Sequence, residues 1–138
     1  MGSSPSGPVQ NFGDYMKESF DELFRTVKLD RKNSNFSQRC TLESRYKELL
    51  SEIEEIEKAI ENGDLKNLKE ELGDALWDLM FLFAIAEEKQ IDPKDVIEEV
   101  IEKIKRRKPW IFTGEKLSID EEIERWKKVK KQEKSQKS

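Results

Sequence analysis

Two helical patterns joined by a short turn limit what this chain can fold into. They run from Leu49 to Glu88 around the turn Asn62-Gly63-Asp64. Each pattern carries two carboxylates three residues apart, and these four residues are Glu52, Glu55, Glu71 and Asp74. Residues three or four apart share one face of a helix, so each pair can converge on one point. Because the turn lies close to midway between the pairs, an antiparallel hairpin brings all four carboxylates to a similar height.

The second pair of carboxylates lies on an apolar face. At about 100° per residue, Glu71, Asp74 and Asp78 fall within about 60° of one another. The same face carries the apolar residues Leu68, Phe81, Leu82 and Ile85. Carboxylates that repel each other in apolar surroundings must be paired, protonated or bound to a cation. Oxygen ligands favour a hard divalent cation, so we predict that the four paired carboxylates bind Mg²⁺, with Mn²⁺ as a substitute.

A basic cluster ends the next predicted helix, which begins with Asp92 as N-cap and Pro93 at its first position. Lys103, Arg106 and Arg107 lie near its end. Cations there complement the helix dipole. They can also bind an anion, and arginine is suited to bidentate contacts with phosphate. We interpret these three residues as phosphate-binding groups.

Composition and helix signals predict an all-α fold. Charged residues make up 41% of the chain and hydrophobic residues 35%, with only 6 Gly and 4 Pro, which is typical of solvated helices around a narrow apolar seam. We expect helices over residues 41–61, from 64 to about 89, and from 92. A capping box at Ser118 and Glu121 predicts the start of a last, short helix.

The length of 138 residues fits one domain. We expect residues 1–10 to form a flexible tail, residues 11–130 to form the helical domain and residues 131–138 to form a charged flexible tail. Within the domain, the spacing of apolar and aromatic residues predicts a first helix over about 12–27. A polar connector is expected over 31–39.

The second helix of the hairpin is almost apolar all round after Gly73. A helix with so little polar surface is normally buried on most sides, and one chain of this length offers few helices to cover it. We therefore expect a homodimer or a higher homo-oligomer. The predicted architecture is an antiparallel helical bundle completed by oligomerisation.

The sequence argues against several other classes of protein. It contains one cysteine, Cys40, and no histidine, so it has neither an intramolecular disulfide nor a Cys-His catalytic pair. No apolar run approaches the roughly 20 residues that span a bilayer, and no signal peptide is apparent. The net charge of -4 does not favour a nucleic-acid partner. We expect a cytoplasmic protein that contacts neither a membrane nor nucleic acid.

The carboxylate pairs also resemble a known family. Ser51-Glu52-Ile53-Glu54-Glu55 and Glu71-Leu72-Gly73-Asp74 are similar to the E-E-x-x-E and E-x-x-D motifs of the MazG family of all-α nucleoside triphosphate pyrophosphohydrolases, with Ser51 in place of the leading glutamate. Further similar passages are CTLESRY, EKIKRRKPWIF and RWKKVKKQEK. The resemblance covers about residues 34 to 134.

This resemblance implies a reaction. It predicts that water attacks the α-phosphorus of a (deoxy)nucleoside triphosphate to give the monophosphate and pyrophosphate, with Mg²⁺ as cofactor and a stand-alone role in nucleotide-pool housecleaning. Glu55 or Glu52 would accept the proton of the water. The phosphates would bind to Lys103, Arg106 and Arg107.

Four further residues are candidates for contact with the nucleotide. Asp78 is open to several roles: a place in the metal cluster, a second ion held through water, a hydrogen bond to the nucleotide, or a structural salt bridge. Trp77, Phe81 and Trp110 could form a wall for the base, although core packing is the favoured interpretation for the two helical aromatics, Trp77 and Phe81.

The sequence is also compatible with two alternative functions. One is a non-catalytic helical oligomerisation or interaction module, in which the acidic residues are surface charge. The other is a related all-α pyrophosphatase with a narrower nucleotide substrate.

Overall fold

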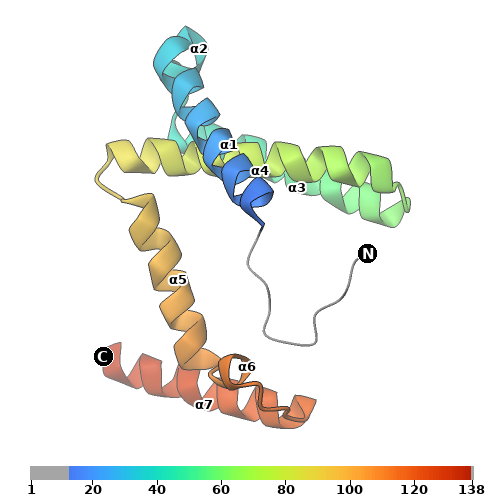
Figure 1. The fold of residues 1–138 in the computed structure, drawn as a ribbon, viewed down its shortest axis with the longest axis vertical. Coiled ribbons are helices and arrows are strands. Elements are labelled where there is room, and N and C mark those ends of the chain that lie inside the picture. The colour runs from blue at the N-terminus through green and yellow to red at the C-terminus, as the bar shows by residue number, and fades with distance from the viewer. Residues whose placement is uncertain (1–12, 138) are drawn as a thin grey trace. The chain divides into compact units, whose positions relative to one another are not determined.

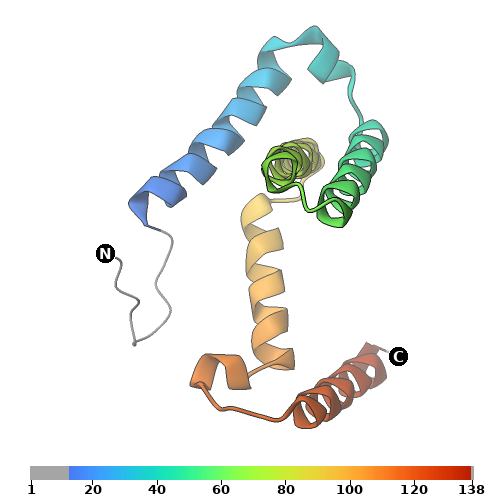
Figure 2. The ribbon, with the colours of Figure 1, turned by 90° about the vertical axis from the view of Figure 1, so that its right-hand side faces the viewer.

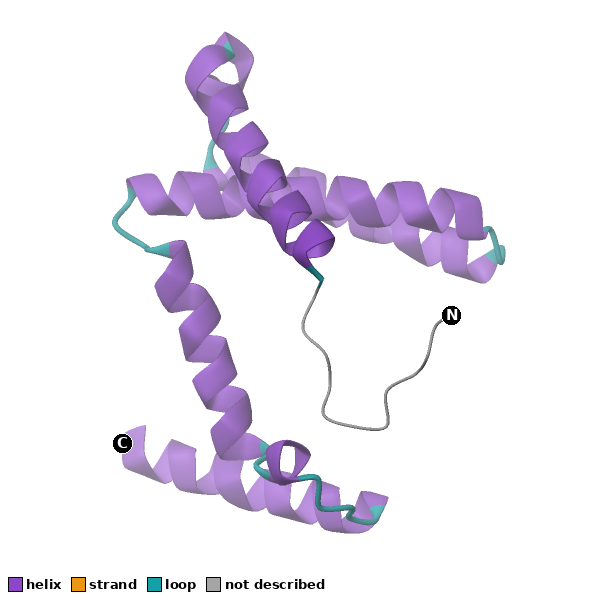
Figure 3. Ribbon diagram, viewed as in Figure 1, coloured by secondary structure: helices purple, strands orange, loops and turns teal. Residues whose placement is uncertain are grey.

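The structure is a computed structural model that describes residues 13–137, and the flexible tail expected over 1–10 lies outside the described residues. Every regular element in the described range is a helix (Figure 3), so the predicted all-α class is confirmed. The helices are α1 (Asp14–Asn33), α2 (Asn35–Arg39), α3 (Leu42–Glu61), α4 (Leu65–Glu88), α5 (Pro93–Arg107), α6 (Trp110–Thr113) and α7 (Ile119–Lys137). None of these helices combines the length and the apolar character that crossing a bilayer requires.

The chain divides after Gln90 into two compact units. In the first unit, α3 and α4 form an antiparallel hairpin and α1 packs across α4 (Figure 1). The view along α4 in Figure 2 shows this helix between α1 and α3. The core of the unit consists of residues from α1 and α4, which are Val27, Phe81, Ala84 and Ile85. The predicted hairpin is therefore present, with α4 as its central helix.

Side-chain caps fix the starts of α3, α4, α5 and α7 where the sequence predicts them. Thr41 and Ser44 form a reciprocal capping box at the start of α3. Asp64 accepts a hydrogen bond from the backbone N–H of Asn67 at the start of α4, and Asp92 caps α5 in the same manner. These caps satisfy N–H groups that have no partner within the helix. The capping box of Ser118 and Glu121 is likewise confirmed.

Three features differ from the expected helix pattern. The polar connector over 31–39 contains a helix, α2, because the Ser34 side chain caps it and Arg31 binds the carbonyls of Ser37 and Cys40. A one-turn helix, α6, follows Pro109. The last helix is not short, since α7 continues through residue 137. The flexibility expected of 131–138 stays a prediction, but residues 131–137 are helical.

One chain leaves part of the central helix α4 uncovered. Within one chain, Leu65, Leu72 and Leu79 are 75%, 53% and 42% exposed. In the apolar stretch after Gly73, Leu79 is exposed, whereas Phe81, Ala84 and Ile85 are buried and the other apolar residues are partly buried. The expectation that an oligomer completes the burial of this stretch stays a prediction.

The second unit, residues 91–137, is held by α5 and α7. Arg106 and Arg107 of α5 both pair with Glu133 of α7. Trp110 of α6 is 4% exposed, and its indole Nε1 donates a hydrogen bond to the Glu122 carboxylate at 3.1 Å. Among the described residues of this unit, Trp110 is the one buried hydrophobic residue. Polar contacts between helices therefore contribute a large part of what holds this unit together.

The turn between α3 and α4 depends on Gly63, which has a φ of +63°. No atom lies within 4 Å of the position that a Cβ would occupy there, so a substitution would be opposed by the backbone conformation alone. Gly63→Ala should lower the free energy of unfolding by about 1–2 kcal/mol, which is the cost of a left-handed backbone for a residue with a Cβ. Gly63→Asn should lose less, because asparagine tolerates this conformation. Urea unfolding measures both, and an equal loss in the two variants would contradict this account of the turn.

Candidate metal centre

Three carboxylates meet where α3 packs against α4. Glu52 of α3 lies opposite Glu71 and Asp74 of α4, and one carboxylate oxygen from each residue lies within 4.8 Å of the others. Glu71 is buried, Glu52 is partly buried and Asp74 is exposed. The antiparallel hairpin therefore brings the two acidic pairs together through three of their four members, with one side of the group open to solvent.

The electrostatics of this group show that the three charges repel. The pKa of Glu52 is raised from 4.5 to about 7, first because its carboxyl shares a hydrogen bond with Glu71, then because it is shielded from water and lies close to the charges of Glu71 and Asp74. Without a cation the group retains a proton near neutral pH. Three hard oxygen donors around one point form a donor set that fits Mg²⁺ or Mn²⁺.

Glu55 lies apart from this group. Its carboxylate pairs with Lys58 on the same helix at 3.3 Å, and its side chain is 43% exposed. An ion pair this exposed contributes little to stability, so Glu55 can exchange its partner readily. Its role as a metal ligand or as a base stays a prediction.

Asp78 forms a buried ion pair with Arg45 of α3. The Arg45 Nη2 atom lies 2.5 Å from the Asp78 Oδ1 atom, and the two side chains are 12% and 6% exposed. The Arg45 guanidinium also lies over the Phe81 ring, with its Cζ atom 4.3 Å from the ring centroid. Burial raises the pKa of Asp78, and Arg45 counteracts this rise. Of the roles left open for Asp78, the salt bridge is the one present in the described residues.

Arg45 is the residue that sequence reasoning missed. The sequence does contain a signal for it, since Arg45 lies seven residues before Glu52 and Asp78 lies seven residues after Glu71. Seven residues are close to two helical turns. An antiparallel hairpin that pairs Glu52 with Glu71 therefore also pairs Arg45 with Asp78.

The aromatic candidates in α4 lie in the core or against it. Phe81 is 1% exposed, whereas Trp77 is partly buried and meets the Phe81 ring edge-on with 6.4 Å between centroids. Trp110 is buried in the second unit, at 4% exposed. A contact between these three rings and a base stays a prediction.

The basic candidates all belong to the second unit. Lys103 is exposed. Arg106 and Arg107 are 54% and 24% exposed, and their hydrogen bonds to Glu133 hold the pKa of that carboxyl at about 2. Binding of phosphate by Arg106 or Arg107 would have to compete with Glu133.

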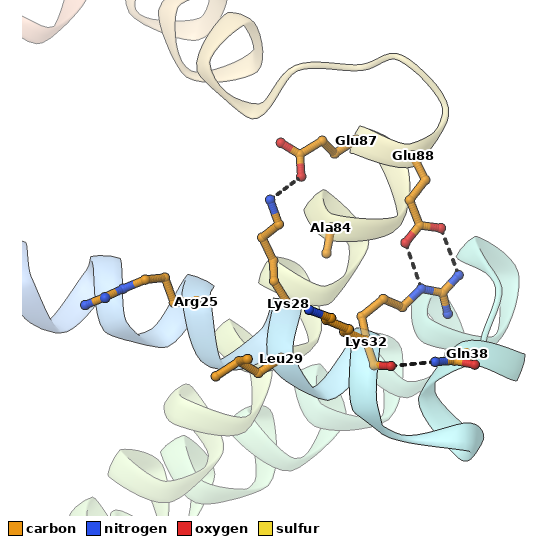
Figure 4. Close-up of a pocket in the computed structure, with 9 residues that line it drawn as sticks. Arg25, Lys28, Leu29, Lys32, Gln38, Ala84, Glu87 and Glu88 are labelled. Carbon is orange, nitrogen blue, oxygen red and sulfur yellow. Dashed lines mark hydrogen bonds and ion pairs between the residues drawn. The ribbon is translucent and has the colours of Figure 1, made fainter.

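A separate cavity of about 820 Å³ lies between α1, α2 and the end of α4 (Figure 4). Its two acidic residues are already paired, Glu87 with Lys28 at 2.9 Å and Glu88 with Arg31 at 2.9 Å. Arg31 lowers the pKa of Glu88. None of the three clustered carboxylates lines this cavity, so its size does not identify it as the metal site.

Comparison with known proteins identifies a matching protein family. The profile of the MazG nucleotide pyrophosphohydrolase domain matches residues 40–112. This range contains all three clustered carboxylates.

Individual relatives agree with this match. The chain is 36% identical over 101 residues to a nucleoside triphosphate pyrophosphohydrolase of Mycolicibacterium smegmatis, a match that covers 71% of this chain and 31% of the relative. It is 32% identical over 91 residues to the nucleoside triphosphate pyrophosphohydrolase of Escherichia coli K12, and this match covers 64% of this chain and 35% of the relative. The chain thus spans about a third of the length of these curated relatives.

A solved structure is also similar. The crystal structure of a MazG-related protein from Thermotoga maritima matches with a TM-score of 0.78 and 36% sequence identity. The match covers 80% of this chain and 98% of that chain.

The raised pKa of Glu52 predicts a stability that depends on pH. The folded carboxyl keeps its proton up to about pH 7, whereas the ordinary value is 4.5. The metal-free protein should therefore lose stability as pH rises from 4.5 to 7, by on the order of 1–3 kcal/mol. Glu52→Gln should remove this loss, so that the variant is more stable than the wild type at pH 8 in EDTA.

Urea unfolding at pH 5 and pH 8 measures this difference. Glu54→Gln is the matched control, because Glu54 is exposed on the same helix and its replacement should leave the pH dependence intact. Added Mg²⁺ should stabilise the wild type more at pH 8 than at pH 5, because it competes with the proton for the same carboxylates. Equal stability of the wild type at both pH values in EDTA would refute the mutual repulsion of the three carboxylates.

Proposed function

Since this chain belongs to the MazG nucleotide pyrophosphohydrolase family, we propose that it is a Mg²⁺-dependent nucleoside triphosphate pyrophosphohydrolase. The proposed substrates are (deoxy)nucleoside triphosphates, and the products are the monophosphate and pyrophosphate. The single observation that carries the proposal is the group formed by Glu52, Glu71 and Asp74, with oxygens within 4.8 Å of one another.

The donor set supports the metal part of the proposal. Glu52, Glu71 and Asp74 supply three carboxylates to one point, and the exposed side of the group leaves room for the phosphates of a substrate. Mg²⁺ held by carboxylates normally takes other ligands from water and substrate phosphate. When bound, the ion supplies positive charge to the phosphoryl oxygens and makes a nearby water more acidic. Mn²⁺ can fill the same donor set.

The chain's own residues supply the proton acceptor. Water adds to the α-phosphorus, the bond to the bridging oxygen of the pyrophosphate breaks, and the proton of the water passes to a carboxylate. The sequence has no histidine, so Glu55 or Glu52 takes this role in the proposal. Glu55 suits it because its side chain is 43% exposed and is paired with Lys58 in an exposed ion pair. Lys103, Arg106 and Arg107 are the proposed phosphate-binding cations, and Asp78, Trp77, Phe81 and Trp110 complete the set of proposed substrate contacts.

Exposed apolar side chains support a homodimer or a higher homo-oligomer. Leu50 and Ile53 of α3 are 41% and 49% exposed, and Leu72 and Leu79 of α4 are exposed to a similar degree. Apolar surface gathered on two neighbouring helices is a mark of a protein interface. A cytoplasmic role in removing unwanted nucleotides belongs to the same proposal, because nucleoside triphosphates are produced and consumed in that compartment.

Pyrophosphate release tests the activity. The purified chain with Mg²⁺ and a panel of NTPs and dNTPs should release pyrophosphate, and Glu71→Gln should lower kcat/KM by at least about 100-fold because it removes a metal ligand. Glu70→Gln is the matched control, since Glu70 is exposed and adjacent on α4. No release from any nucleotide would refute the proposal and favour the non-catalytic helical module.

Sedimentation tests the oligomer. The wild type should have at least twice the mass of one chain, and Leu79→Glu should shift it toward the monomer, because a charge would be buried at the interface. Lys66→Glu also adds negative charge on α4, yet it replaces an exposed polar residue and should leave the mass unchanged. A monomeric wild type at micromolar concentration would contradict the expectation.

A further inference from the structure

The α3–α4 hairpin is constrained at both ends, and the clustered carboxylates lie between the constraints. At one end Gly63 closes the turn, with its φ of +63°. Toward the other end, Arg45 of α3 pairs with Asp78 of α4. Arg45 and Asp78 are each seven residues, or roughly 10 Å along the helix, further from the turn than Glu52 and Glu71.

The charges between these constraints push the two helices apart. Glu52 of α3 lies opposite Glu71 and Asp74 of α4, with one oxygen of each carboxylate within 4.8 Å of the others, and carboxylates this close repel one another when they are charged. The apolar contacts that hold α3 against α4 are not directional, so they permit either helix to rotate and separate the carboxylates. An ion pair between buried groups does set orientation, and its best-documented use in helical proteins is to select one register.

Two contacts with α4 fix the position of the Arg45 side chain. Its Nη2 atom donates to the Asp78 carboxylate, and its guanidinium plane lies over the ring of Phe81, which is 1% exposed. Its Nε atom is buried without a hydrogen-bond partner in the described residues. The side chain is therefore placed by one carboxylate and one aromatic face, and both belong to α4.

We propose that the Arg45–Asp78 ion pair clamps the open end of the α3–α4 hairpin and thereby positions Glu52 beside Glu71 and Asp74 for metal binding. In this role Arg45 and Asp78 are positioning residues, since they act through the three clustered carboxylates. This role replaces the direct substrate contact proposed for Asp78, because Arg45 already occupies its carboxylate. The effect on metal binding rests on the proposed metal-dependent function. The ion pair that clamps the hairpin does not depend on that function.

The decisive variant replaces both partners, as Arg45→Met with Asp78→Leu. Exchange of a buried ion pair for apolar residues of similar volume is often neutral or stabilising, so the melting temperature should not fall. Mn²⁺ affinity, measured by calorimetry, should fall by at least about 10-fold, as it does when groups that orient metal ligands are lost. A merely structural ion pair would leave Mn²⁺ affinity unchanged.

Two further variants sharpen the result. Arg45→Lys keeps the charge but loses the planar stack on Phe81, and it should bind Mn²⁺ with an affinity between those of the wild type and the double variant. Lys28→Met with Glu87→Leu removes an ion pair that joins α1 to α4 (Figure 4) and leaves α3 untouched. This control should bind Mn²⁺ within about twofold of the wild type, because loss of a pair outside the hairpin does not move the ligands.

A distance measurement tests the clamp without metal. Spin labels on Glu43→Cys and Lys89→Cys, both exposed positions near the open end, can be read by double electron–electron resonance after Cys40→Ser and dilution with unlabelled chain. The distance distribution should broaden when Arg45→Met and Asp78→Leu are combined in this background. An unchanged distribution would overturn the clamp.

The outcomes separate this inference from the proposed function. Mn²⁺ affinity within twofold of the wild type in the folded double variant overturns the positioning role, even if the enzyme hydrolyses nucleotides. If the wild type binds no Mn²⁺, the metal-dependent function fails, and the spin-label distances alone decide whether the clamp exists. If the double variant does not fold, Arg45→Lys decides, and wild-type Mn²⁺ affinity in that variant overturns the proposal.

Discussion

Repulsion among carboxylates at the α3–α4 interface is the constraint on which the rest of this structure depends. Glu52, Glu71 and Asp74 bring oxygens within 4.8 Å of one another, and this crowding raises the pKa of Glu52 to about 7. The fold must hold these groups together against their own charge. A closed turn at one end and a buried ion pair at the other meet that requirement in the hairpin, while α1 supports α4 from the opposite side.

Arginine–carboxylate pairs join helices at three places in the described residues. Arg31 joins α1 to Glu88 of α4, Arg45 joins α3 to α4, and Arg106 with Arg107 joins α5 to α7. A chain that is 41% charged and 35% hydrophobic has few apolar residues with which to specify how its helices face each other. Directional pairs supply orientation, and the exposed apolar surface of α3 and α4 remains available for a second copy.

The proposed chemistry agrees with the absence of histidine and the single cysteine in the sequence. Without histidine and with one cysteine, which is free, proton transfer falls to carboxylates. The environments of the acidic residues differ accordingly. The pKa of Glu52 is raised to about 7, while the Glu55 side chain is 43% exposed and pairs with Lys58. In the proposed reaction, Glu52 contributes to cation binding and Glu55 is the candidate to take up the proton.

The sequence by itself determined the features that depend on nearby residues. Caps at Thr41, Asp64 and Asp92, the turn at Gly63 and the shared face of Glu71 with Asp74 follow from spacings of a few residues, because hydrogen bonds within a turn and helical periodicity are local. Tertiary structure alone decided which distant groups became partners. Arg45 pairs with Asp78, and Glu133 pairs with both arginines at the end of α5, because each pairing depends on which side chains from another helix come within reach and how much water remains around them.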